Sequence, residues 1–249
     1  MVILSQESSG VPLPPHDEIR AQLAYDRMTN DHLAQQVVSQ SVQIVGQQER
    51  IQGLELQATR NPVTHLYNEV GFNTRLDQIR ETLPNTPIAI IEVDLGNFKL
   101  INDKLGHPVG DTVLRAVGAG FRESDAEMLV GHPHGDEFRV AAPLEARQNQ
   151  ELSDEERLQA MINRLKVVGE MLKAQIPQLA ALGFSISAGG AILRPGMGLA
   201  EVIQEADKAM YRDKHEYKEA IFKSLPLRQR IAHHVGTTLL KYSRAQPSR

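Results

Sequence analysis

The sequence predicts an α/β fold, in which a mixed β-sheet is flanked by helices and preceded by a long N-terminal helix. Short apolar runs rich in β-branched residues alternate with longer segments of helical periodicity. Two of the short runs flank a turn and predict an antiparallel hairpin, and residues 17–58 contain no proline. Strands that alternate with helices but include a hairpin are typical of an α+β sandwich rather than a purely parallel sheet.

The composition is that of a protein with a substantial core and no strong charge. Of the 249 residues, 41% are hydrophobic and the net charge is −4, so we expect no nucleic-acid partner. The absence of cysteine excludes disulfides, thiolate metal sites and cysteine nucleophiles. No apolar run reaches the roughly 18 residues that span a bilayer, and no secretory signal is evident. We therefore expect a soluble cytoplasmic protein without a membrane span.

The chain divides into four predicted segments. Residues 1–15 are rich in helix breakers and are expected to be disordered. Residues 16–58 are expected to form a helical stalk, residues 59–224 a globular domain, and residues 225–249 a basic C-terminal helix and tail. In the tail, Ile231, Val235 and Leu239 recur every four residues. This spacing favours a helix docked on the domain or the stalk over a contact with membrane or nucleic acid.

Heptad spacing in the stalk indicates a coiled coil. One heptad position is apolar except for one asparagine: Leu23, Asn30, Val37, Ile44, Ile51 and Ala58. The other position is half polar: Ile19, Asp26, Leu33, Gln40, Gln47 and Leu54. We expect a dimeric stalk, because β-branched residues recur at the first position. The alternative is a single amphipathic helix packed on its own domain.

Strands and helices alternate in the globular segment. Strands are expected at 87–94, 127–131, 137–142 and 183–193, where apolar and β-branched residues cluster. Helices are expected at 108–121, 153–176 and 199–218. Ser153 and Glu156 have the spacing of a capping box, which marks the start of the second of these helices.

Two acids are predicted to meet at one end of the sheet. Asp94 ends a buried strand, where a carboxylate is costly unless it is paired or binds a metal. Asp136 lies in the predicted hairpin, so the two carboxylates converge if the hairpin pairs beside that strand. Mg²⁺ prefers one or two carboxylates and takes its other oxygens from phosphates and water, which predicts a nucleotide triphosphate site. Lys99 adds a positive charge, and Asn102 with Asp111 offers side chains able to recognise guanine.

Five motifs support a closer interpretation, and they stand in this order along the chain: NPVTHLYNE at 61–69, DLGNFKLINDKLGHPVGD at 94–111, HGDEF at 134–138, SAGGA at 187–191 and ADKAMYRDK at 206–214. In sequence and order they resemble the GGDEF family, the diguanylate cyclases. The resemblance covers roughly residues 59 to 220, with a degenerate HGDEF signature in place of GGDEF.

The resemblance implies a sheet like those of nucleotidyl cyclases and polymerase palms, with one GTP bound per domain. Two facing domains would condense two GTP into cyclic di-GMP, so the implied partners are GTP and a second copy joined through the N-terminal helix. The implied ligands of Mg²⁺, or Mn²⁺, are Asp94, the Leu95 carbonyl and Asp136. The implied catalytic residues are Asp136, Glu137 and Lys99. The implied nucleotide-binding residues are Gly135, Asn102, Asp111, Lys214 and Lys218.

His134 is the main departure from the family, since it replaces the first glycine of the signature. We expect this position to need a positive φ, at a cost to histidine of about 1–2 kcal/mol; alternatively, His134 has an adopted role at the site. His132 stands where the family often has arginine, and His65 where it has glycine. We interpret these histidines as surface or turn residues rather than a zinc cluster. Asp125 and Met128 replace the arginine and aspartate of the family's inhibitory site, which we expect to be absent.

The pattern favours an active diguanylate cyclase, because the acids of the site are kept and a carboxylate pair without a metal repels itself. The first alternative is a catalytically inactive GGDEF domain that binds GTP or only dimerises, acting as a scaffold or receptor. The second is a cyclase for a different dinucleotide, although Asp111 favours guanine over adenine.

Overall fold

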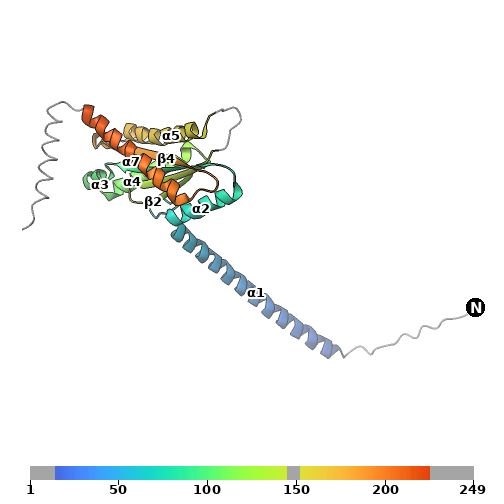
Figure 1. Cartoon of the computed structure of the whole chain (residues 1–249). Coiled ribbons are helices and arrows are strands. Elements are labelled where there is room, and N and C mark those ends of the chain that lie inside the picture. Colours follow the sequence, from blue (N-terminus) through green and yellow to red (C-terminus); the bar gives the residue numbers. More distant parts are fainter. Residues whose placement is uncertain (1–14, 145–151, 225–249) are drawn as a thin grey trace, which may run out of the picture. The chain divides into compact units, whose positions relative to one another are not determined.

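The computed structural model describes residues 15–144 and 152–224 of the chain (Figure 1). The chain divides into two compact units, residues 1–55 and residues 56–249, which are described separately. The predictions for residues 1–14 and 225–249 lie outside the described residues.

The first unit contains most of α1 (His16–Thr59), one uninterrupted helix of 44 residues. Several side chains of the apolar heptad position are each more than half exposed: Leu23, Val37, Ile44 and Ile51. Since most helical stability in proteins comes from packing of an apolar face, this seam is the part of α1 suited to packing. Neither α1 nor any other helix within the described ranges is long and apolar enough to cross a membrane.

The second unit is built from a four-stranded sheet and the helices that cover it (Figure 1). Its strands are β1 (Ile88–Gly96), β2 (Leu129–His134), β3 (Glu137–Pro143) and β4 (Ser185–Leu193). Its helices are α2 (Glu69–Thr82), α3 (Phe98–Leu105), α4 (His107–Ser124), α5 (Asp154–Gln175), α6 (Pro177–Ala181) and α7 (Leu199–Ser224). The sheet order is β2-β3-β1-β4, and all three pairings are antiparallel. The predicted α/β fold with a long N-terminal helix is confirmed.

The central strand β1 is buried along its whole length because helices cover both faces of the sheet. Ile91 and Val93 pack in the core formed with α4 and α5, whereas Ile88 and Ile90 pack with α2 and α7. Successive strand residues point to opposite faces. Asp94 is in phase with Ile88 and Ile90, so it lies on the face covered by α2 and α7.

Several local predictions are confirmed. The hairpin of β2 and β3 is antiparallel, with His134 paired to Glu137 across a two-residue turn. The capping box at the start of α5 is present: the Ser153 hydroxyl accepts from the Glu156 N–H, and the Glu156 carboxylate accepts from the Ser153 N–H.

Other helix boundaries differ from the prediction. The short helix α3 was not predicted, because its eight residues are too few to show a helical period. It ends at Gly106, whose φ of 86° turns the chain into α4. Helix α7 continues to Ser224, six residues beyond the predicted end at Lys218.

Candidate functional site

The structure brings the end of β1 and the turn between β2 and β3 together. Asp94 is paired in register with Glu137, and the Leu95 N–H donates a 3.1 Å hydrogen bond to the Asp136 carbonyl. Asp136 is the second residue of that turn, so its side chain starts beside the end of β1. Glu137 is the first residue of β3, and its side chain is about half exposed.

Lys214 of α7 is the counter-ion of Asp94. Its Nζ lies 2.7 Å from both carboxylate oxygens, and only the contact with Oδ2 has hydrogen-bond geometry. Asp94 is 7% exposed, so Oδ1 is a buried carboxylate oxygen without a hydrogen bond from any described residue. A cation bound by Asp94 would therefore compete with the Lys214 ammonium for this carboxylate.

The amide of Asn102 lies where α3 meets α4. Its Oδ1 is buried without a hydrogen bond from the described residues. Gly110 packs so closely against it that a Cβ on Gly110 would lie 1.9 Å from this oxygen. Asp111 is the next residue of α4, so the close packing of Gly110 brings Asn102 and Asp111 to the same helix junction. The φ of Gly110 is not positive, so the backbone conformation does not require glycine at this position. Glycine is required because any Cβ would clash with Asn102.

The remaining predicted site residues lie on α3 and α7. Lys99 is exposed in the first turn of α3, directly after the end of β1. Lys218 is exposed on α7, four residues after Lys214 and therefore on the same side of that helix.

The residue types at the end of β1 are compatible with one divalent metal ion. No group of three or more acidic or histidine side chains able to hold a metal occurs in residues 15–144 and 152–224. Mg²⁺ does not need such a group, because it is bound through one or two carboxylates together with phosphates and water. Asp94 and Asp136 supply two carboxylates of this kind. Oδ1 of Asp94 is buried and accepts no hydrogen bond from the described residues, although the Lys214 ammonium lies 2.7 Å from it.

The expectation of a positive φ at His134 is wrong. The positive φ of the turn, 59°, falls on Gly135, the first of the two loop residues, where a type II′ turn uses glycine. His134 is the last residue of β2, and its imidazole is 69% exposed with Nδ1 3.4 Å from Glu137 Oε2. Among described non-glycine residues, positive φ occurs at His65 (57°) and Asn97 (61°). The strain expected at His134 therefore falls on His65, which also stands where the family has glycine.

Because His134 carries no backbone strain, we expect His134→Gly to change turnover by less than about threefold. The variant should lower stability by roughly 0.5–1 kcal/mol, because glycine loses more backbone freedom on folding. By contrast, Gly135→Ala should cost about 1–2 kcal/mol through φ alone, since no atom lies within 4 Å of the added Cβ. Thermal melts and kcat measurements on both variants and on His134→Ala test this. A tenfold rise in turnover for both His134 variants would show that the imidazole itself hinders the site.

Two buried features near the site were not expected from the sequence. His132 is 2% exposed inside β2, so its interpretation as a surface or turn residue is wrong, whereas it holds for His134 and His65. Glu92 of β1 and Arg139 of β3 form a cross-strand ion pair with Nε 2.5 Å from Oε1. Burial raises the pKa of Glu92 to about 7, and the Arg139 guanidinium opposes this shift. The sequence contained a signal for this ion pair, because Glu92 and Arg139 are opposite charges that each stand inside an apolar strand segment.

The positions of the family's inhibitory site serve internal packing in this chain. Asp125 caps the C-terminal end of α4, and its carboxylate lies 3.0 Å from the Arg164 guanidinium of α5. Met128 is 7% exposed and belongs to the core. A carboxylate held by Arg164 therefore stands where that site has an arginine.

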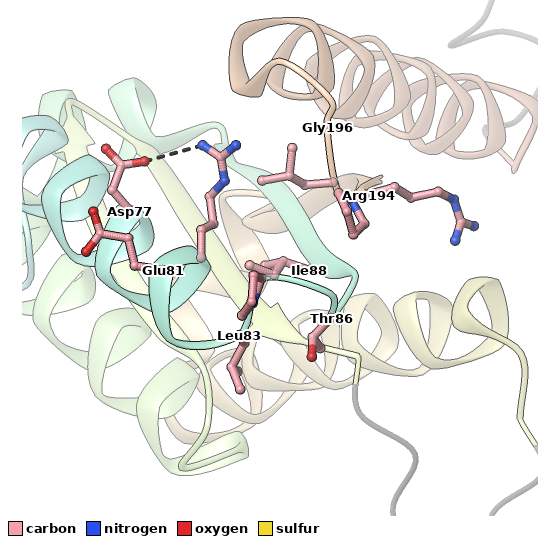
Figure 2. Close-up of a pocket in the computed structure, with 11 residues that line it drawn as sticks. Asp77, Glu81, Leu83, Thr86, Ile88, Arg194 and Gly196 are labelled. Atoms are coloured by element: carbon pink, nitrogen blue, oxygen red, sulfur yellow. Dashed lines mark hydrogen bonds and ion pairs between the residues drawn. The ribbon is translucent and has the colours of Figure 1, made fainter.

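A separate cavity of about 390 Å³ lies at the opposite end of β1 (Figure 2). Its lining includes Asp77, Glu81 and Leu83 from and after α2, with Ile88 and Arg194. Ile88 and Asp94 are six residues apart on one strand, which corresponds to about 20 Å. This cavity is therefore not part of the acidic site.

Fold and site together define an α/β domain with two acids at the end of its central antiparallel strand. The chain belongs to the GGDEF family: the family model described as "Diguanylate cyclase, GGDEF domain" matches residues 58–220.

Known proteins resemble this chain across the same region. DgcT of Escherichia coli strain K12, described as a probable diguanylate cyclase, is 30% identical over 163 residues, covering 63% of this chain and 34% of DgcT. The diguanylate cyclase DosC of the same strain is 34% identical over 140 residues, covering 55% of this chain and 28% of DosC. The matches thus span about a third or less of these relatives.

Solved structures share the fold. The coiled coil and GGDEF domain of DgcB from Caulobacter crescentus, in complex with c-di-GMP, gives a TM-score of 0.59 at 22% identity, covering 74% of this chain and 95% of that chain. At this level of identity the likeness shows the fold.

Proposed function

We propose that this protein is a diguanylate cyclase, which condenses two GTP into cyclic di-GMP across a dimer of its GGDEF domains. The observation that carries the proposal is the backbone pairing that places Asp136 beside the end of β1, next to Asp94, with Lys214 against Asp94. In the proposed reaction each 3′-hydroxyl attacks the α-phosphate of the other GTP, and pyrophosphate leaves.

We assign the roles from position and charge. Asp94, Asp136 and the Leu95 carbonyl would hold Mg²⁺ or Mn²⁺, which when bound polarises phosphate oxygens and stabilises developing negative charge. Lys99, Lys214 and Lys218 would bind phosphate groups. The residue that assists removal of the 3′-hydroxyl proton is Glu137, and the peptide of Gly135 passes beside the nucleotide. The position of Asn102 and Asp111 at one helix junction supports guanine recognition, in which the Asn102 amide meets an acceptor of the base and the Asp111 carboxylate accepts from its N–H edge.

The direct test is to incubate the full chain with GTP and Mg²⁺ and to separate the nucleotides by chromatography. Formation of cyclic di-GMP supports the proposal. GTP binding without any product would instead support the inactive scaffold, the alternative raised by histidine in place of the first glycine of the signature. Because GTP is a cytoplasmic nucleotide, the proposed function places the domain in the cytoplasm.

The proposed dimer forms through the apolar seam of α1, since the reaction needs two domains. Tethering raises the effective concentration of the second domain into the mM range for short linkers. We therefore expect deletion of residues 1–55 to make specific activity fall steeply when the protein is diluted. This boundary keeps the hydrogen bonds that Ala58 and Thr59 accept from Asn68.

The measurement is initial rate against protein concentration, for the full chain and the truncated chain. Sedimentation of both proteins reports the dimer without relying on activity. A truncated protein whose specific activity is unchanged over a hundredfold dilution would contradict the proposed role of the stalk.

A further inference from the structure

The turn that carries Asp136 is tied to the loop that follows α1, and the ties converge on His132. The His132 ring lies with Nε2 3.0 Å from the Gly135 carbonyl oxygen and Nδ1 3.1 Å from Thr64 Oγ1. Thr64 belongs to residues 60–68, the connection between α1 and α2. A buried side chain therefore bridges two segments that are about 70 positions apart in the chain.

The partners of the ring determine which nitrogen carries the proton. A carbonyl oxygen only accepts hydrogen bonds, so Nε2–H is the donor to Gly135. Burial lowers the pKa of His132, which keeps the ring neutral at pH 7. In the neutral ring Nδ1 is the acceptor, so the Thr64 hydroxyl donates to it. Both ring nitrogens are satisfied only in the Nε2–H tautomer.

The backbone of His132 is held by the same loop. Its N–H donates to the Tyr67 carbonyl over 2.7 Å, and its carbonyl accepts from Asn61 Nδ2 over 3.2 Å. The ring also stacks on Phe138 with centroids 4.4 Å apart and an interplanar angle of 8°. The ring orientation is therefore defined by hydrogen bonds on both edges and by stacking on one face.

These contacts fix the geometry of the acidic turn. His132 holds the Gly135 carbonyl, and Leu95 holds the Asp136 carbonyl, so two successive peptides of the turn are anchored. No atom lies within 4 Å of a Cβ built on Gly135, so no side chain packs over this glycine. The strand pairing of His134 with Glu137 closes the turn, and the hydrogen bond from His132 adds a side-chain anchor to the Gly135 peptide.

We propose that His132 is a positioning residue that couples residues 60–68, directly after α1, to the turn presenting Asp136 and Glu137. A displacement of the loop next to the stalk helix would reach the acidic turn through Thr64 and the His132 ring. The effect on catalysis rests on the proposed cyclase function. The effect on turn geometry and on metal binding does not.

The test compares variants of the full chain that keep or remove each contact. His132→Phe keeps stacking on Phe138 but loses both hydrogen bonds, whereas His132→Gln can place its amide nitrogen where Nε2 lies. Thr64→Val removes the hydroxyl at nearly constant volume, and Thr64→Ser keeps it.

We expect His132→Phe to lower kcat and to weaken binding of Mn²⁺ alone, each by about tenfold or more, with KM for GTP little changed. His132→Gln and Thr64→Ser should recover most of both quantities, and Thr64→Val should fall between.

A nucleotide-free measurement separates this proposal from the proposed function. Nitrogen-15 NMR of the histidines should show an Nε2–H tautomer at pH 7 whose signal is lost in His132→Gln and shifted in Thr64→Val. If the protein makes no cyclic di-GMP but these signals and the Mn²⁺ affinities change as expected, the positioning role stands and the cyclase function fails. If Mn²⁺ affinity and kcat stay within about twofold in His132→Phe, the positioning role is overturned. Should His132→Phe not fold, Thr64→Val decides by the same criteria.

Discussion

Replacing Asp94 with asparagine is expected to lower cyclic di-GMP formation by about 10³-fold or more while the fold stays intact. Such a loss corresponds to about 4 kcal/mol of transition-state stabilisation. The reason is electrostatic: asparagine keeps the shape of the side chain but removes the negative charge that a divalent cation needs. The Lys214 ammonium, which lies 2.7 Å from Asp94, would also lose its counter-ion. Asp136→Asn should have an effect of the same order.

The matched control is Asp77→Asn, which removes one carboxylate of α2 at the far end of the sheet (Figure 2). Its only described ion pair is an exposed contact with Arg80, 3.4 Å long, so both activity and stability should stay close to those of the parent. The measurements are product formation by chromatography, circular dichroism for the fold, and Mn²⁺ titration. Near-parental turnover of Asp94→Asn would show that the metal site has been assigned to the wrong residues.

Replacing Arg139 with methionine is expected to lower the free energy of unfolding by about 3–5 kcal/mol. The side chains of Glu92 and Arg139 are 10% and 11% exposed, so at pH 8 the change leaves a buried acid without its partner, and that acid must stay charged and unpaired or take up a proton. The double variant Glu92→Leu with Arg139→Met removes both charges from an apolar strand pair and should lose much less. Urea denaturation of the parent, both single variants and the double variant gives the coupling energy.

The loss should depend on pH in a direction set by Glu92. Its pKa in the folded protein is raised to about 7, above the ordinary value of 4.5, so the folded state favours the protonated acid. The stability that this group contributes is present at low pH and is lost as pH rises through about 7. Arg139→Met removes the guanidinium that lowers this pKa, so Glu92 stays protonated to a higher pH in the folded variant, and the loss should be smaller at pH 6 than at pH 8. Equal losses at both pH values, or a double variant as unstable as Arg139→Met, would contradict the assigned ion pair.

Much of the fold was predictable because it follows from short-range patterns. The apolar run before Asp94 defines the central strand, the paired runs around residues 134–137 define the hairpin, and Ser153 with Glu156 defines a helix start. These signals work because backbone geometry repeats every two residues in strands and every 3.6 residues in helices. The order of the motifs was likewise sufficient to indicate the family.

The acidic site was predictable only in part. That Asp94 and Asp136 lie near each other follows from one strand pairing, which the hairpin pattern already favours. The position of the positive φ did not follow, because it depends on which two residues form the loop. The pairing with β3 places His134 opposite Glu137, so the turn begins at Gly135.

By itself, the sequence determined the α/β class, the long N-terminal helix, the family and the residue types of the candidate site. Only the tertiary structure decided which distant side chains contact each other in and near the site. These contacts are Lys214 with Asp94, Arg139 with Glu92, and Thr64 with His132. Each of these pairs joins positions between 47 and 120 residues apart. Local periodicity carries no information about such pairs, because they form only when the packing of α7, β3 and the loop after α1 brings their partners within hydrogen-bond distance.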